Sequence, residues 1–104
     1  MNTVSAECRT VQEWMQRSKR QMRPVPAELA SHVSECSLCR AAVYTMLATL
    51  LPTPVQPISC DACEEQLGDF IELERSNARQ AMQRYPEIWQ HLWFCGDCAE
   101  TYTL

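Results

Sequence analysis

Two short stretches of this chain carry the same potential metal ligands at the same spacing. Both read His-x3-Cys-x2-Cys, and the two copies are His32, Cys36, Cys39 and His91, Cys95, Cys98. Together they use both histidines and four of the seven cysteines. Thiolate sulfur and imidazole nitrogen are ligands that Zn2+ prefers, in a tetrahedral arrangement. Identical spacing in both copies favours metal binding over the alternative that these are buried core side chains.

Each copy supplies three ligands, so each requires a fourth from an upstream residue. Cys8 precedes the first copy, whereas Cys60 and Cys63 both precede the second. The sequence after Cys63 resembles the sequence after Cys8, since in both a cysteine opens an amphipathic helical run. We therefore predict two zinc ions per chain with Cys60 left over, although Cys60 could instead replace His91 or Cys63 as a ligand. The predicted sites are Cys8, His32, Cys36, Cys39 and Cys63, His91, Cys95, Cys98.

The ligand spacing also constrains the backbone. Residues i, i+4 and i+7 of a straight helix extend over about 10 Å of its axis. Sulfur ligands of one zinc ion lie only about 3.8 Å apart. His32 and Cys36 can therefore share a helix, but Cys39 can join them only if the chain turns. We expect such a turn, termed the knuckle, in each Cys-x2-Cys segment, with a new helix starting in it whose N–H groups could donate to the thiolates.

The spacing of apolar residues predicts an all-α fold. In the first half we expect helices over residues 4–22, from Pro26 onwards, and over residues 38–51. In the second half we expect one long helix, capped by Ser59 or Asp61 and ending at Tyr85, and then a short helix from Pro86 to the second knuckle. Only two glycines are present, and no long stretch alternates with a two-residue period, which argues against a β-sheet.

A proline-rich segment divides the chain into two copies of one unit. Residues 52–58 contain three prolines and suit neither a strand nor a helix. We predict a first zinc-stapled unit over residues 1–51 and a second over residues 59–104, each arranged as helix–helix–knuckle–helix. Units of this size bury little apolar surface and usually need a metal or a disulfide. The odd number of cysteines and their CxxC spacing favour metal.

Charge and hydropathy favour a protein partner over nucleic acid or membrane. Residues 1–40 carry six Lys or Arg against four Asp or Glu, and residues 41–104 carry three against nine, within a formal net charge of −4. Such an acidic chain would repel nucleic acid. No apolar run is long enough to span a bilayer, and residues 1–7 lack the basic start and apolar core of a signal peptide. We therefore expect a cytoplasmic protein with reduced thiols and no membrane or nucleic-acid partner.

The ligand pattern resembles the zinc-binding anti-sigma factor domain family. That family has an early Cys or His in its first helix and then a His-x3-Cys-x2-Cys motif. The matching residues are Cys8, His32, Cys36, Cys39 in residues 4–51, and Cys63, His91, Cys95, Cys98 in the second copy. The resemblance implies a helical domain that masks the polymerase-binding surface of a sigma factor through the helix after its knuckle, and sometimes releases it when oxidation expels the zinc. The chain departs from the family because a second finger stands where a sensor or membrane-spanning segment is usual, and because no long helix follows Cys98.

These observations lead to two hypotheses for function. The first is a zinc-binding transcription regulator that acts by protein–protein interaction, resembles an anti-sigma factor and responds to thiol oxidation. The second is a zinc-stapled adaptor or assembly subunit with no sigma partner. An enzyme is not expected, because a catalytic zinc keeps one position open for water and each site here has four protein ligands. The aromatic side chains Trp89, Trp93 and Phe94 leave a homo-oligomer open.

Overall fold

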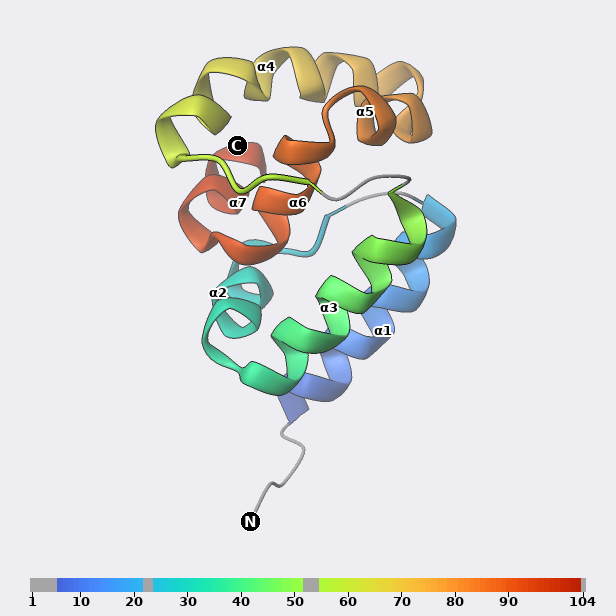
Figure 1. The fold of residues 1–104 in the computed structure, drawn as a ribbon, viewed down its shortest axis with the longest axis vertical. Helices are drawn as coiled ribbons and strands as arrows, with labels where there is room; N and C mark the ends of the chain where they lie inside the picture. The colour runs from blue at the N-terminus through green and yellow to red at the C-terminus, as the bar shows by residue number, and fades with distance from the viewer. Residues whose placement is uncertain (1–5, 22–23, 52–54, 104) are drawn as a thin grey trace.

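The computed structural model describes residues 6–21, 24–51 and 55–103. Within these residues all regular secondary structure is helical, which confirms the predicted all-α fold (Figure 1). The helices are α1 Ala6–Gln21, α2 Ala27–Glu35, α3 Ser37–Leu50, α4 Cys60–Ser76, α5 Ala78–Arg84, α6 Pro86–Phe94 and α7 Gly96–Thr103.

The first three helices lie close to their predicted positions. α1 and α3 run side by side, and α2 packs against both (Figure 1). Pro26 is the N-cap of α2 and precedes its first helical residue, where its missing N–H leaves no donor unpaired. Val11 of α1, Val33 of α2 and Val43 of α3 are fully buried and form the centre of this half.

The long helix predicted up to Tyr85 is two helices, α4 and α5, because the chain breaks at Asn77. This residue is extended, with φ −159° and ψ 95°. Its side-chain oxygen accepts a hydrogen bond from the Gln80 backbone N–H at 3.0 Å and so caps the start of α5. Ser59 caps α4 in the same way, accepting from the Ala62 N–H at 3.1 Å, so Ser59 is the N-cap of the two candidates. Pro86 begins α6 as predicted.

The two sequence copies share one hydrophobic core. α2 of the first copy packs against α6 and α7 of the second, and α3 also reaches α6 (Figure 1). Trp89 and Trp93 of α6 are fully buried, with their rings edge to face at 6.1 Å, and belong to this core. Of the predicted linker, residues 52–54 lie outside the described residues, and residues 55–58 have no regular structure. The linker therefore joins two copies that pack together.

Gly68 provides a test of local helix stability. It lies in the interior of α4, and a Cβ built there would meet nothing within 4 Å. We expect Gly68→Ala to raise the free energy of unfolding by about 0.5–1 kcal/mol, because alanine loses less backbone entropy in a helix. Urea denaturation of the metal-loaded protein measures this, and a loss of stability would show that the position is not open.

Candidate metal centres

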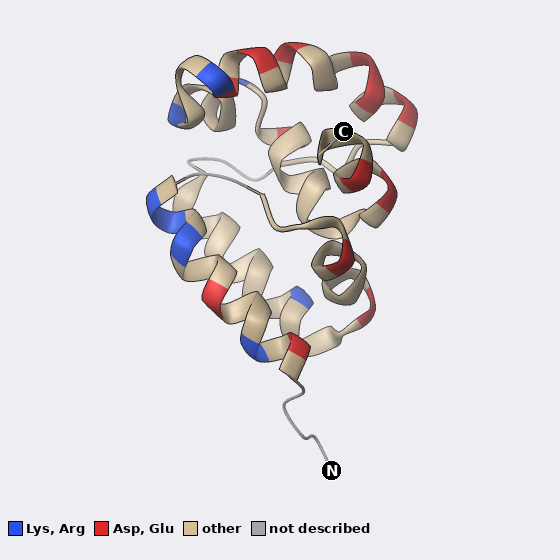
Figure 2. Ribbon diagram, turned by 180° about the vertical axis from the view of Figure 1, so that it is seen from behind, with Lys and Arg blue, Asp and Glu red and all other residues tan. Residues whose placement is uncertain are grey.

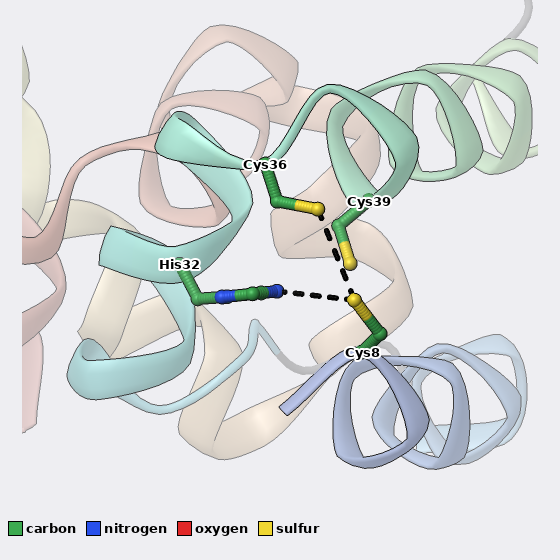
Figure 3. Close-up of side chains that lie close together, drawn as sticks. All are labelled: Cys8, His32, Cys36 and Cys39. Carbon is green, nitrogen blue, oxygen red and sulfur yellow. Dashed lines mark hydrogen bonds between the residues drawn. The ribbon is translucent and has the colours of Figure 1, made fainter. Parts of the chain in front are cut away.

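The first cluster brings together the four predicted ligands. Cys8 comes from α1, His32 from α2, Cys36 from the turn and Cys39 from α3, and their side chains converge on one point (Figure 3). All four ligand atoms lie within 4.8 Å of one another. Cys8 Sγ is 3.4 Å from His32 Nε2 and 3.8 Å from Cys36 Sγ. Tetrahedral zinc requires separations of about 3.8 Å between two sulfurs and about 3.6 Å between sulfur and nitrogen. The cluster therefore has the dimensions of a metal site.

The predicted knuckle is present at Cys36. This residue is extended, with φ −96° and ψ 114°, and it ends α2 and caps α3. Its N–H donates to the His32 carbonyl at 2.8 Å, and its own carbonyl accepts from the Arg40 N–H at 2.8 Å. One residue thus closes one helix and opens the next. Because α3 starts there, Cys39 lies in its first turn and its sulfur points towards Cys8 in the centre of the cluster (Figure 3).

The second cluster repeats this geometry on the other copy. Cys60 at the start of α4, His91 of α6, Cys95 in the turn and Cys98 of α7 place their ligand atoms within 4.8 Å of one another. Cys60 Sγ is 3.7 Å from His91 Nε2 and 3.6 Å from Cys95 Sγ. Cys95 is extended, its N–H donates to the His91 carbonyl, and its carbonyl accepts from the Ala99 N–H, each at 3.0 Å. Two Cys3His clusters in one chain could hold two metal ions.

The fourth member of the second cluster is Cys60, whereas the sequence pattern predicted Cys63. Cys60, predicted to be spare, lies in the cluster, whereas Cys63 is fully buried and lies outside it. His91 remains in the cluster, so the four-cysteine alternative does not describe it either. The reason lies in the start of α4. Because Ser59 caps the helix, Cys60 is the first residue of α4 and reaches His91, while Cys63 at the end of the same turn lies among core side chains, next to Cys98.

Sequence reasoning missed one residue beside the first cluster. The Glu7 carboxylate lies 3.7 Å from Nδ1 of His32, while Nε2 of the same ring faces the cluster. A carboxylate on the second ring nitrogen of a metal-binding histidine orients the ring and raises its basicity. The 3.7 Å separation is longer than a direct hydrogen bond, so Glu7 is a close carboxylate neighbour of the ring. Its position directly before Cys8 is the signal that could have identified it.

The electrostatics of both clusters fit a cation. Burial, together with the neighbouring Cys8 and Cys36, raises the pKa of Cys39 to about 12. Burial also raises the pKa of Cys98, and the hydrogen bond with Cys95 raises that of Cys60. Thiols crowded in this way keep their protons at neutral pH unless a positive ion offsets their mutual repulsion. Burial lowers the pKa of His91, which favours the neutral imidazole that binds metals.

Comparison with known proteins found no relative of this chain. No protein-family model, characterised protein or solved structure matches this chain. Across the described parts of the chain, no helix combines the length and apolar character needed to cross a bilayer. What the protein does must therefore be argued from its two clusters and its surface.

The assignment of Cys60 leads to a direct test. We expect Cys60→Ser to lose the second metal ion or to bind it at least about 10-fold more weakly, because a ligand is removed. Cys63→Ser is the matched control and should retain both ions, with some loss of stability from a buried hydroxyl. Metal content by native mass spectrometry separates the two outcomes. If Cys60→Ser retained two ions and Cys63→Ser lost one, Cys63 would be the fourth ligand, as the sequence predicted.

The raised thiol pKa values predict a steep pH dependence of metal binding. A metal ion must displace the protons of Cys39 and of its two partner thiols, so affinity should fall as pH falls. With up to three protons displaced per cluster, the affinity should drop by up to about 1000-fold per pH unit below neutrality. Competition with a chelator at several pH values between 6 and 8 measures the slope, and a flat profile would contradict thiolate ligation.

Proposed function

We propose that both clusters bind zinc and that the metal stabilises the fold. Three thiols and one imidazole at tetrahedral separations support zinc over harder cations such as Mg2+ or Ca2+, which take oxygen ligands. Four protein ligands leave no position open for a reacting water, which supports a structural role and argues against an enzyme. The chain has one core of modest size, which four-ligand metal sites would reinforce.

We further propose that the protein acts by binding another protein through the face formed by α1 and α3. A shallow apolar depression lies between these helices beside the first cluster, and its lining residues are Cys8, Val11, Gln12, Met15, Leu38, Cys39 and Ala42. Leu38 stands at its edge with 51% of its surface exposed, unusual for a leucine next to two metal ligands. This exposed leucine on the metal-held knuckle is the observation that carries the proposal.

Only part of α3, the helix expected to contact a partner, is exposed at the surface. Met46 and Leu47 of α3 are buried in the core, whereas Leu38 and Tyr44 are exposed. Contact with a partner would therefore involve the first turns of α3 together with α1. The later turns of α3 instead pack into the core through Met46 and Leu47.

The charge of the molecule indicates what kind of partner fits. Basic residues lie along α1, and acidic residues follow α4 on the opposite half (Figure 2). Arg9 lines a second hollow on α1 that shares Gln12 and Met15 with the depression, and Arg17 packs over the ring of Trp14 at 5.0 Å. A partner surface with an apolar side chain bordered by carboxylates would match this face. The acidic second half would repel a nucleic-acid backbone.

A sigma factor is the partner that we propose, in a cytoplasmic transcription regulator. The support is the resemblance of the first cluster to the anti-sigma zinc domain, now joined to a geometry in which all four pattern residues converge. The alternative is a zinc-stapled adaptor without a sigma partner. It is favoured by the second copy, whose α7 packs against α2 as a structural support.

Leu38→Glu tests the proposed face. The substitution adds an acidic residue to the first turn of α3, where it suits the helix dipole, so folding and metal content should be preserved. We expect binding to a sigma factor to weaken by at least about 10-fold, because an apolar anchor is replaced by a charge. Ala48→Glu is the matched control, since Ala48 is exposed on α3 and does not line the depression.

The measurement is binding of zinc-loaded protein to each purified sigma factor of the host. Binding that Leu38→Glu weakens and Ala48→Glu leaves intact would support the proposal. If no sigma factor binds while a different purified protein binds in a Leu38-dependent way, the adaptor function replaces it. Equal weakening by Leu38→Glu and Ala48→Glu would show that the depression at Leu38 is not the specific site of contact.

A further inference from the structure

The two clusters lie on helices that pack directly against each other. α2 carries His32 of the first cluster, and α7 carries Cys98 of the second. These two helices lie side by side although they come from different copies of the unit (Figure 1). The contact therefore joins one ligand-bearing element to the other.

Gly96 of α7 closely approaches Ser31 of α2 within this contact. A Cβ built on Gly96 would lie 2.0 Å from Ser31 Oγ, 3.3 Å from Ser31 Cβ and 3.4 Å from the Ala27 carbonyl oxygen. A side chain at Gly96 would displace the Ser31 hydroxyl and press against Ser31 Cβ and the Ala27 carbonyl oxygen of α2. Gly96 directly follows the ligand Cys95, and Ser31 directly precedes the ligand His32. A shift of the second knuckle would therefore displace Ser31, which is the residue directly before His32 of the first cluster.

A second contact joins the same knuckle to α3. The rings of Tyr44 and Phe94 stack with centroids 4.5 Å apart and an interplanar angle of 25°. Phe94 directly precedes Cys95, and α3 carries Cys39 in its first turn. The second knuckle is therefore held on both sides by residues of the first copy.

We propose that the two metal sites are thermodynamically coupled, so that an ion bound at one raises the affinity of the other. The inference rests on the proposed metal binding and goes beyond it. Metal binding in small units of this kind also supplies folding free energy, since the ligands must be ordered to bind. An ordered second knuckle supplies the surface on which α2 packs, which lowers the cost of ordering His32. By linkage the effect is equal in both directions, and coupling of this type typically amounts to about 5–150-fold.

The coupling is measured by a cycle of zinc affinities on the full chain. Cys98→Ala leaves only the first site and Cys39→Ala leaves only the second, and each gives a single-site constant by chelator competition. The product of the two stepwise constants of the unsubstituted chain should exceed the product of these single-site constants by about 5–150-fold. Equality of the two products would overturn the proposal. A chain that binds no zinc would instead refute the proposed metal binding, so the two failures are distinct.

Interface variants show whether the coupling runs through the described contact. Gly96→Ala should reduce the coupling, because its Cβ displaces Ser31 Oγ and presses on Ser31 Cβ and the Ala27 carbonyl, and Ser31→Ala in the same chain should restore part of it by removing the hydroxyl. Gly68→Ala is the matched control and should leave the coupling unchanged, since its position is open. Native mass spectrometry gives a second readout. When one zinc is bound per chain on average, independent sites leave at least half of the molecules with a single ion, whereas tenfold coupling of equal sites leaves about a quarter.

If the second site of Gly96→Ala fails to fold, Tyr44→Ala provides the alternative, because Tyr44 is half exposed and its loss removes the stacking on Phe94. It should lower the coupling with both single-site constants unchanged. Full coupling in Gly96→Ala and in Tyr44→Ala would exclude these contacts as its route.

Discussion

The close approach of four ligands around one point is the constraint on which this structure depends. A tetrahedral ion needs its donors about 3.8 Å apart, and a straight helix cannot bring three ligands of a His-x3-Cys-x2-Cys stretch so close. The chain therefore turns at Cys36 and at Cys95, and each turn starts a new helix. The fourth ligand then holds the upstream helix against the pair. Ligand geometry thus determines how the three ligand-bearing elements of each half meet.

The geometry of the clusters and the packing of the core support each other here. Several cluster cysteines are also core residues, since Cys8, Cys39 and Cys98 are buried among apolar side chains. Their burial makes bare thiolates unfavourable, so a cation is needed for the same residues to act as ligands. Packing of α2 against α7 covers one side of the first half. It does not cover the depression between α1 and α3.

The sequence could predict the local features of this structure and not those that depend on distant contacts. The knuckles follow from spacing within eight residues, and α6 follows from Pro86. The choice between Cys60 and Cys63 could not be predicted, because both lie in the first turn of α4 and the choice depends on where Ser59 starts the helix and on what covers Cys63. The helix break at Asn77 could not be predicted from the sequence, because the helical spacing of apolar residues continues across it.

The packing of the two copies has a consequence for the order of events during synthesis. All ligands of the first cluster lie within residues 8–39, so this cluster can be completed early in translation. The surface of α2 that receives α7 stays uncovered until the last helix has emerged, since Ser31 and Gly96 are separated by most of the chain. Contacts of such long sequence separation form late. A nascent chain would thus carry a complete first cluster beside an unfinished core, a state in which exposed apolar surface attracts chaperones.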